Sequence, residues 1–283
     1  HGRANVLNNL GLIYENMGMY SKALECYQES LPILTRHGDT RSVAATRNNM
    51  GILYREIGGY TQALEQFLKS LEILRAVRDM HGEASTLNNI GAVYSASGDF
   101  INALEYHHRS LALLQHLDDR HGQTMVLTSI GWVQFKLRNY REALACLVQN
   151  LDVIHALGDP QTLADTLGDI GDVYFALADM PAALEYYERC HGHATHIGYC
   201  RRQIEALLGM GNVHMHHGAH EQAVTAYVEA LGLAARMGSK ELAAKAHLGL
   251  AAAYESAGSF DVAIKHLRLH LAAKEEVFSE ESQ

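Results

Sequence analysis

The chain has 283 residues and a formal net charge of −9 with histidine neutral, because 32 Asp and Glu outnumber 23 Lys and Arg. Binding of nucleic acid or of an anionic membrane surface depends on clustered basic residues, so this balance disfavours both partners. The sequence has neither an apolar run of about 18 residues nor a signal-peptide pattern at its start, and we therefore expect a cytoplasmic protein with no membrane span.

The stretch from Leu7 to Leu31 recurs along the whole chain at a spacing of 40 residues, without insertion or loss. A fixed period of this size is typical of a solenoid built from stacked identical units. We therefore predict a single array over residues 1–280, with residues 272–283 as the end of the last helix and the start of a linker. Its seven units are 1–40, 41–80, 81–120, 121–160, 161–200, 201–240 and 241–280.

Within one unit the apolar residues fall on two helical faces that are separated by Gly18. The first copy predicts one helix over Arg3–Met17 and another over Tyr20–Arg36, with the glycine as a C-cap and tight turn. The position of Gly11 is glycine in six copies, and the position of Ala23 is alanine in all seven. Small residues at fixed points let two helix backbones approach closely. Each unit is therefore expected to be an antiparallel helix pair.

Leu7, Gly11, Tyr14, Gly18, Tyr20, Ala23, Tyr27 and Leu31 form a pattern that resembles the tetratricopeptide repeat. The usual unit of that family has about 34 residues. The longer unit of this chain resembles the repeats of kinesin light chains, LGN-like scaffolds and bacterial sensor proteins. The resemblance implies an all-α fold, an α-solenoid that winds as a right-handed superhelix of seven antiparallel helix pairs, about 14 helices in all. It also implies a concave groove lined by the first helix of each pair.

Paired asparagines recur on the first helix of copies one to three, where the resemblance places them in the groove: Asn8, Asn9, Asn48, Asn49, Asn88 and Asn89. An Asn side chain offers a donor and an acceptor together, which suits the backbone of an extended peptide. We predict a ladder of amides that binds such a peptide, to which Asn212 of the sixth copy is added. The alternative is that one Asn of each pair bonds to the adjacent helix and only specifies packing.

Copies four and five carry two further candidate groups. Trp132, the only tryptophan, and Phe135 lie one turn apart in the fourth copy and would anchor an apolar side chain, or would merely fill a wider gap. In the fifth copy Asp165, Asp169 and Asp172 share one helix face and would select a basic partner segment. The alternative for these three carboxylates is a solvated face offset by the nearby Arg189, Arg201 and Arg202.

Histidine is concentrated in copies five and six, at His191, His193, His196, His214, His216, His217 and His220. Helical spacing of three residues within this group is compatible with a transition metal. The spread of histidine through the rest of the chain favours ordinary surface or turn residues, so we predict no metal and no cofactor. The four cysteines lack C-x-x-C spacing, which indicates free thiols in a reducing cytosol, and Cys26 and Cys146 are expected to be buried.

No nucleophile elbow, P-loop, zinc-protease or dinucleotide motif occurs, so we expect no enzyme in this chain. The leading hypothesis is a regulatory module that binds a protein or peptide segment in its concave groove. The resemblance further implies the sensory domain of a larger bacterial signalling protein, with a diguanylate cyclase or histidine kinase module beyond the last helix. The alternatives are an autonomous oligomerisation scaffold, which would form a homodimer through uncapped terminal repeats, and a metal-responsive module.

Overall fold

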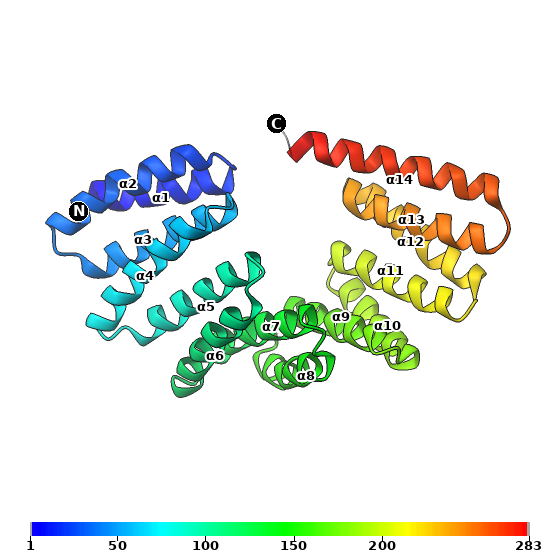
Figure 1. Cartoon of the computed structure of the whole chain (residues 1–283), viewed down its shortest axis with the longest axis horizontal. Helices are drawn as coiled ribbons and strands as arrows, with labels where there is room; N and C mark the ends of the chain where they lie inside the picture. The colour runs from blue at the N-terminus through cyan, green and yellow to red at the C-terminus, as the bar shows by residue number, and fades with distance from the viewer. Residues whose placement is uncertain (1, 282–283) are drawn as a thin grey trace. The chain divides into compact units, whose positions relative to one another are not determined.

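The computed structural model describes residues 2–281, and within that range it contains fourteen α-helices and no β-strand (Figure 1). The first helices of the pairs are α1 (Gly2–Asn16), α3 (Thr40–Glu56), α5 (Met80–Ala96), α7 (Arg120–Lys136), α9 (Pro160–Ala176), α11 (Cys200–His216) and α13 (Lys240–Ser256). The second helices are α2 (Tyr20–Arg36), α4 (Tyr60–Ala76), α6 (Phe100–His116), α8 (Tyr140–Leu157), α10 (Met180–His196), α12 (His220–Met237) and α14 (Phe260–Glu281). The predicted all-α fold of helix pairs is therefore confirmed.

The turns repeat as regularly as the helices. Gly18, predicted as a C-cap, has a φ of +69°, and Gly38 at the end of the second helix has a φ of +67°. The same left-handed position recurs every 20 residues, but it is occupied by a residue other than glycine at Arg78, Asp118, Arg138 and Ala178. A side chain with a Cβ costs roughly 1–2 kcal/mol in this conformation. The period of the array is therefore maintained even where the local residue disfavours the turn.

Aspartates begin several of the helices, at a position that sequence reasoning did not use. Asp39, Asp79 and Asp119 each accept a hydrogen bond from the backbone N–H three residues later, and so satisfy one of the free donors of the helix start. Pro160 lies in the first turn of α9, where its missing N–H leaves no hydrogen bond unmade. Pro32 lies inside α2 instead. Pro32 is on the exposed side of α2, where water can take the carbonyl that loses its partner.

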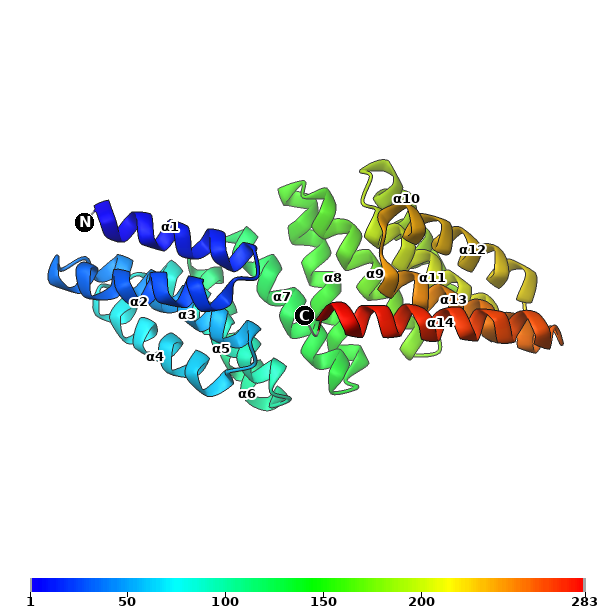
Figure 2. The same cartoon turned by 90° about the horizontal axis from the view of Figure 1, so that it is seen from above.

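The helices divide into two compact units, His1–Asn139 and Tyr140–Gln283, so the boundary falls between α7 and α8 of the fourth pair. Each unit is described by itself below. In unit one, α1 to α7 pack in chain order. In unit two, α8 to α14 do the same, and Figure 2 shows α14 lying along α13.

The small positions of the repeat bring the helices together as predicted. Ala23 is fully buried, and so are its equivalents in copies two to six. A Cβ added to Gly51 would lie 2.6 Å from the ring of Phe67, so only glycine leaves room for that ring.

The four cysteines are free: Cys26 is buried as expected, but Cys146 is only half-buried.

The first helices of the pairs form the inner layer of each unit. In unit one α1 contacts α3, α3 contacts α5 and α5 contacts α7; in unit two α9 contacts α11 and α11 contacts α13. Among the described residues, the second helices of successive pairs make no comparable contacts. Because the more closely spaced layer of a bent stack is its concave one, the first helices line the concave side of each unit.

Candidate functional site

The inner layer of unit two contains a pocket of about 660 Å³. Its lining comes from α9, α11 and α13, with one residue of α12: Phe175, Leu208, Asn212, Met215, His216, Tyr227, Lys245, Leu248, Gly249 and Ala252. Binding pockets are typically apolar concavities with a few polar groups that fix orientation. Here the apolar walls come from Phe175, Leu208 and Leu248, and the polar groups are Asn212, His216 and Lys245.

Tyr227 lies at the base of this pocket, where Gly249 of α13 approaches its ring so closely that a Cβ would lie 2.6 Å away. Its hydroxyl donates a hydrogen bond of 2.7 Å to Oδ1 of Asn212. Burial raises the pKa of Tyr227 to about 12, so the hydroxyl keeps its proton as the donor. The amide oxygen of Asn212 is therefore engaged within the fold. Its Nδ2 group has no partner among the described residues and can donate to a ligand carbonyl.

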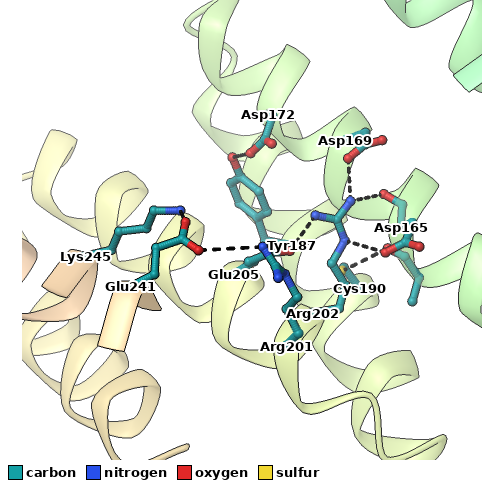
Figure 3. A network of polar contacts seen from close by, with 11 residues as sticks. Asp165, Asp169, Asp172, Tyr187, Cys190, Arg201, Arg202, Glu205, Glu241 and Lys245 are labelled. Atoms are coloured by element: carbon teal, nitrogen blue, oxygen red, sulfur yellow. Dashed lines mark hydrogen bonds and ion pairs between the residues drawn. The ribbon is translucent and has the colours of Figure 1, made fainter. Parts of the chain in front are cut away.

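The three aspartates on α9 extend this inner layer toward the start of the helix, and Arg202 of α11 reaches two of them (Figure 3). Its Nε lies 3.2 Å from Oδ1 of Asp165, and its Nη2 binds both Asp169 and the backbone oxygen of Asp165. Its Nη1 donates 2.9 Å to Glu205. The Arg202 side chain is 12% exposed, so this guanidinium is an internal counterion for the acidic face.

Asp172 lies beyond the reach of that guanidinium and accepts a 2.7 Å hydrogen bond from the hydroxyl of Tyr187. Loss of hydration raises its pKa to about 6, although the Tyr187 hydrogen bond acts in the opposite direction. Burial likewise raises the pKa of Asp165 and Asp169, and Arg202 opposes the shift in both cases. Arg202 contacts Asp165, Asp169 and Glu205 but not Asp172, and Arg201 contacts only Glu205 among these four carboxyl groups, so the face keeps an excess of negative charge.

A chain of ion pairs connects this acidic face with the pocket (Figure 3). Arg201 lies 3.1 Å from Glu205 and 3.9 Å from Glu241. Lys245, which lines the pocket, is 2.6 Å from the same Glu241. The apolar pocket and the acidic face therefore lie side by side on one inner layer.

The six paired asparagines lie in unit one, where the first member of each pair, and Asn89 as well, bonds within the fold. Asn8 donates to Thr46 and accepts from Ser30, both at 2.7 Å. Asn48 accepts from Asn89 at 3.0 Å, and Asn88 lies 2.8 Å from His107. Asn9 and Asn49 make no hydrogen bond with other described side chains, and Asn48 also lines a pocket of about 320 Å³. The packing role considered for these amides is thus seen directly for Asn8, Asn48 and Asn88, while peptide binding stays a prediction.

The predicted aromatic pair also lies in unit one, on α7. Trp132 is 47% exposed, and its ring lies edge-on to Phe100 at 6.1 Å between centroids. It lines a pocket of about 360 Å³ to which Phe135, half-buried on the same helix, does not contribute. The two aromatic side chains therefore do not share one pocket wall.

The concentration of histidines does not form a cluster of metal ligands. Among residues 2–277, whose side chains the structure describes, there is no group of three or more His, Cys, Asp or Glu side chains that could hold an ion. His216 is instead part of the pocket lining and lies edge-on to His217.

Among residues 2–281, no helix is long and apolar enough to cross a bilayer.

Sequence reasoning missed the pocket residues Leu208, Lys245 and Leu248. A signal was nevertheless present, because Leu208 and Leu248 occupy the repeat position of Asn8, and Lys245 that of Asp165. Because the position of Asn8 was predicted to face the groove in copy one, Leu208 and Leu248 could have been predicted to face it in copies six and seven.

A family model described as tetratricopeptide repeat matches residues 2–76, 82–153 and 133–195, and a second model with the same description matches residues 208–276. A search of curated proteins gave no match. Among solved structures, the chain is 19% identical to a signal transduction ATPase with numerous domains and a tetratricopeptide repeat sensor, from Pyrococcus horikoshii. That match has a TM-score of 0.82 and covers 98% of this chain but only 43% of the other.

Two further solved structures match this chain over a larger share of their own length. RapI in its apo form matches with 14% identity and a TM-score of 0.77, over 98% of this chain and 99% of that one. The apo quorum sensor NprR from B. thuringiensis matches with 15% identity and a TM-score of 0.74, over 95% and 75% respectively. At these identities the similarity establishes the fold.

Proposed function

Since the chain belongs to the tetratricopeptide repeat family, we propose that it is a regulatory module that binds an extended protein or peptide segment along its inner layer. The observation that carries this proposal is the 660 Å³ pocket on α9, α11 and α13. This pocket has apolar walls and the free Nδ2 donor of Asn212. An apolar side chain of a bound peptide would pack against the walls, and a neighbouring peptide carbonyl would accept a hydrogen bond from Nδ2. The module itself carries no catalytic role in this proposal.

The charge next to the pocket favours a basic ligand. Asp172 lies on α9, one turn before the pocket residue Phe175, and has no cationic partner in direct contact among the described residues. A Lys or Arg in the bound segment would form an ion pair with Asp172, which Arg202 does not contact. We therefore infer a ligand that carries an apolar anchor with a basic residue close to it in sequence.

The similar structures support a sensory role within a larger protein. One is described as a signal transduction ATPase with a repeat sensor, and another as a quorum sensor. A related match is a Rap protein in complex with competence and sporulation factor, at 13% identity and a TM-score of 0.63. We propose that ligand binding changes how the helix pairs stack, and that this change is passed to a cyclase or kinase module of a bacterial signalling protein.

Replacing Leu248 by glutamate should abolish peptide selection by the groove. Leu248 is 48% exposed and lines the pocket, so a carboxylate there would disrupt the apolar walls without burying a charge in the core. A randomised peptide library displayed against the wild-type chain should enrich sequences that pair an apolar residue with Lys or Arg. Affinity for the enriched peptides should fall at least tenfold in Leu248→Glu.

Val228→Glu is the matched control for this experiment, because Val228 is 52% exposed on α12 and does not line the pocket. It adds the same charge to the same unit and should leave selection unchanged. Enrichment of the same peptides by Leu248→Glu and by the wild type would show that the pocket is not the binding site.

The exposed apolar face of α14 supports a second candidate function, an oligomerisation scaffold. Leu267 is 40% exposed, although its equivalents Tyr27 and Phe67 are fully buried, and Ile264 and Leu271 beside it are also exposed. If copies associate through this face, the sedimentation coefficient of the wild type should rise with concentration, while Leu267→Glu should remain monomeric. Leu269→Glu, on another side of α14, is the control that should behave as the wild type. Identical sedimentation of all three chains would remove this candidate.

A further inference from the structure

The third repeat differs from its neighbours at one buried position. The equivalents of Tyr27 are Phe67, His107, Leu147, Tyr187, Tyr227 and Leu267. His107 is 1% exposed, and a Cβ on Gly91 would lie 2.7 Å from its ring, just as the glycines of other repeats approach their rings. The imidazole thus occupies the place of the aromatic ring but lacks the hydroxyl-bearing end of a tyrosine.

In three repeats that end of the tyrosine is engaged with the first helix of the same pair. Tyr27 donates a 2.8 Å hydrogen bond to Glu15, Tyr187 donates to Asp172, and Tyr227 donates to Asn212. The residue of the third repeat that corresponds to Glu15 is Ser95. Its Oγ is buried and has no hydrogen-bond partner among the described residues. The third repeat therefore keeps a polar group at the position of Glu15, has Ala92 at the position that Asp172 and Asn212 share, and has no phenol to meet either residue.

A pocket of about 360 Å³ lies beside the imidazole of His107. It is lined by Ala92, Ser95, Ala96, His107, Thr128, Ser129 and Trp132, all in unit one. This volume is at the lower end of the range of ligand pockets, roughly 300–1,000 Å³. Two alanines and the indole supply apolar walls, so the pocket suits one ring rather than a large ligand.

The polar groups of the pocket have defined hydrogen-bonding roles. Nδ1 of His107 lies 2.8 Å from Oδ1 of Asn88, which can only accept, so Nδ1 carries the proton. Nε2 of the neutral ring then keeps its lone pair, and it has no partner among the described residues. Burial lowers the pKa of His107 to about 4, with a smaller effect from His108, so the ring is neutral near pH 7. The pocket therefore offers one acceptor nitrogen and one unpaired hydroxyl.

We propose that this pocket binds a phenol-type group, with its hydroxyl donating to Nε2 of His107 and accepting from Ser95, and with its ring beside Trp132. The group would come from a tyrosine side chain of a partner segment or from a free small phenol. In three other copies the hydroxyl of an internal tyrosine bonds to the first helix of the pair, and the hydroxyl of the bound phenol would supply a comparable interaction here. The site is separate from the unit-two pocket, so it stands whether or not the proposed groove function is correct.

The probe for this site is p-cresol, with toluene as the matched compound that lacks the hydroxyl. Trp132 is the only tryptophan, so its indole N–H gives a single reporter signal in a ¹H–¹⁵N spectrum. We expect a saturable shift of that signal with p-cresol and at least tenfold weaker binding of toluene, since toluene leaves Nε2 of His107 without a hydrogen-bond donor. N-acetyltyrosinamide distinguishes the two sources: affinity equal to that of p-cresol indicates a tyrosine side chain, and a lack of binding indicates a free phenol.

His107→Tyr is the decisive variant, because it restores the residue of three other copies and should fill the pocket from within. It should remove the p-cresol shift while the thermal midpoint stays the same or rises. His108→Tyr, at the exposed neighbouring position, and Leu248→Glu, in unit two, should leave the shift unchanged. Ser95→Ala should weaken p-cresol about tenfold. The proposal would be overturned if p-cresol caused no shift of the Trp132 signal. It would also be overturned if His107→Tyr bound p-cresol as tightly as the wild type, or if the wild type bound toluene as tightly as p-cresol.

Discussion

Gly171→Ala should lower the free energy of unfolding by about 1–3 kcal/mol, the usual cost of overpacking a core. A Cβ at this position would lie 2.7 Å from the ring of Tyr187, and the ring cannot withdraw because Gly209 of α11 approaches it from the next repeat. The loss is expected although alanine is intrinsically about 1 kcal/mol better than glycine inside a helix. Urea unfolding should therefore show a lower midpoint with an unchanged slope.

Gly192→Ala is the control for this experiment, since Gly192 lies on α10 of the same repeat with no atom within 4 Å of an added Cβ. It should raise stability by up to about 1 kcal/mol, because only the helix preference remains. Tyr187→Leu, the residue found at this position in copy four, should restore part of the loss in Gly171→Ala. Equal effects of the two alanine substitutions would contradict a role for the close approach of ring and helix.

Arg202→Met should destabilise unit two by about 2–4 kcal/mol at pH 7. The change leaves Asp165, Asp169 and Glu205 without the guanidinium that all three contact. Removing one partner of a fully buried ion pair costs about 3–5 kcal/mol, and here the carboxylates are partly exposed, so the expected loss is smaller. Arg201→Met is the matched control: its side chain is 55% exposed, and surface pairs contribute about 0–1 kcal/mol.

The loss in Arg202→Met should also depend on pH. Asp165, Asp169 and Asp172 have raised pKa values in the folded chain. At a pH between the unfolded-state and the folded-state pKa of each carboxyl group, the folded state therefore binds more protons than the unfolded state. Lowering the pH from 7 toward 5 therefore favours the folded state, most strongly when the compensating cation is gone. Urea midpoints of the variant and the wild type should converge as the pH falls. A difference that stays constant over this range would indicate that the acidic face is not the cause.

The interpretation of single residues from the sequence depended on whether their partners lie in the same copy. The packing of Ala23 followed from the repeat itself, because the same small residue recurs at the same position in every helix pair. Arg202 was considered only as a nearby cation, since it lies far from Asp165 in the chain. Its contact with that aspartate exists because α9 and α11 are neighbours in the inner layer. Asn88 was seen as one of a pair, but its contact with His107 required the geometry of α5 against α6.

The sequence by itself determined the period, the helix pairs, the turns and the family, because these depend on local spacing of apolar and small residues that is repeated seven times. Only the tertiary structure decided which side chains of the inner layer already have partners and which are open to a ligand. The pocket on α9, α11 and α13 and the one beside His107 both arise between helices of different pairs. Such spaces depend on the shapes of side chains distant in sequence, and a periodic pattern records only that a helix face is present.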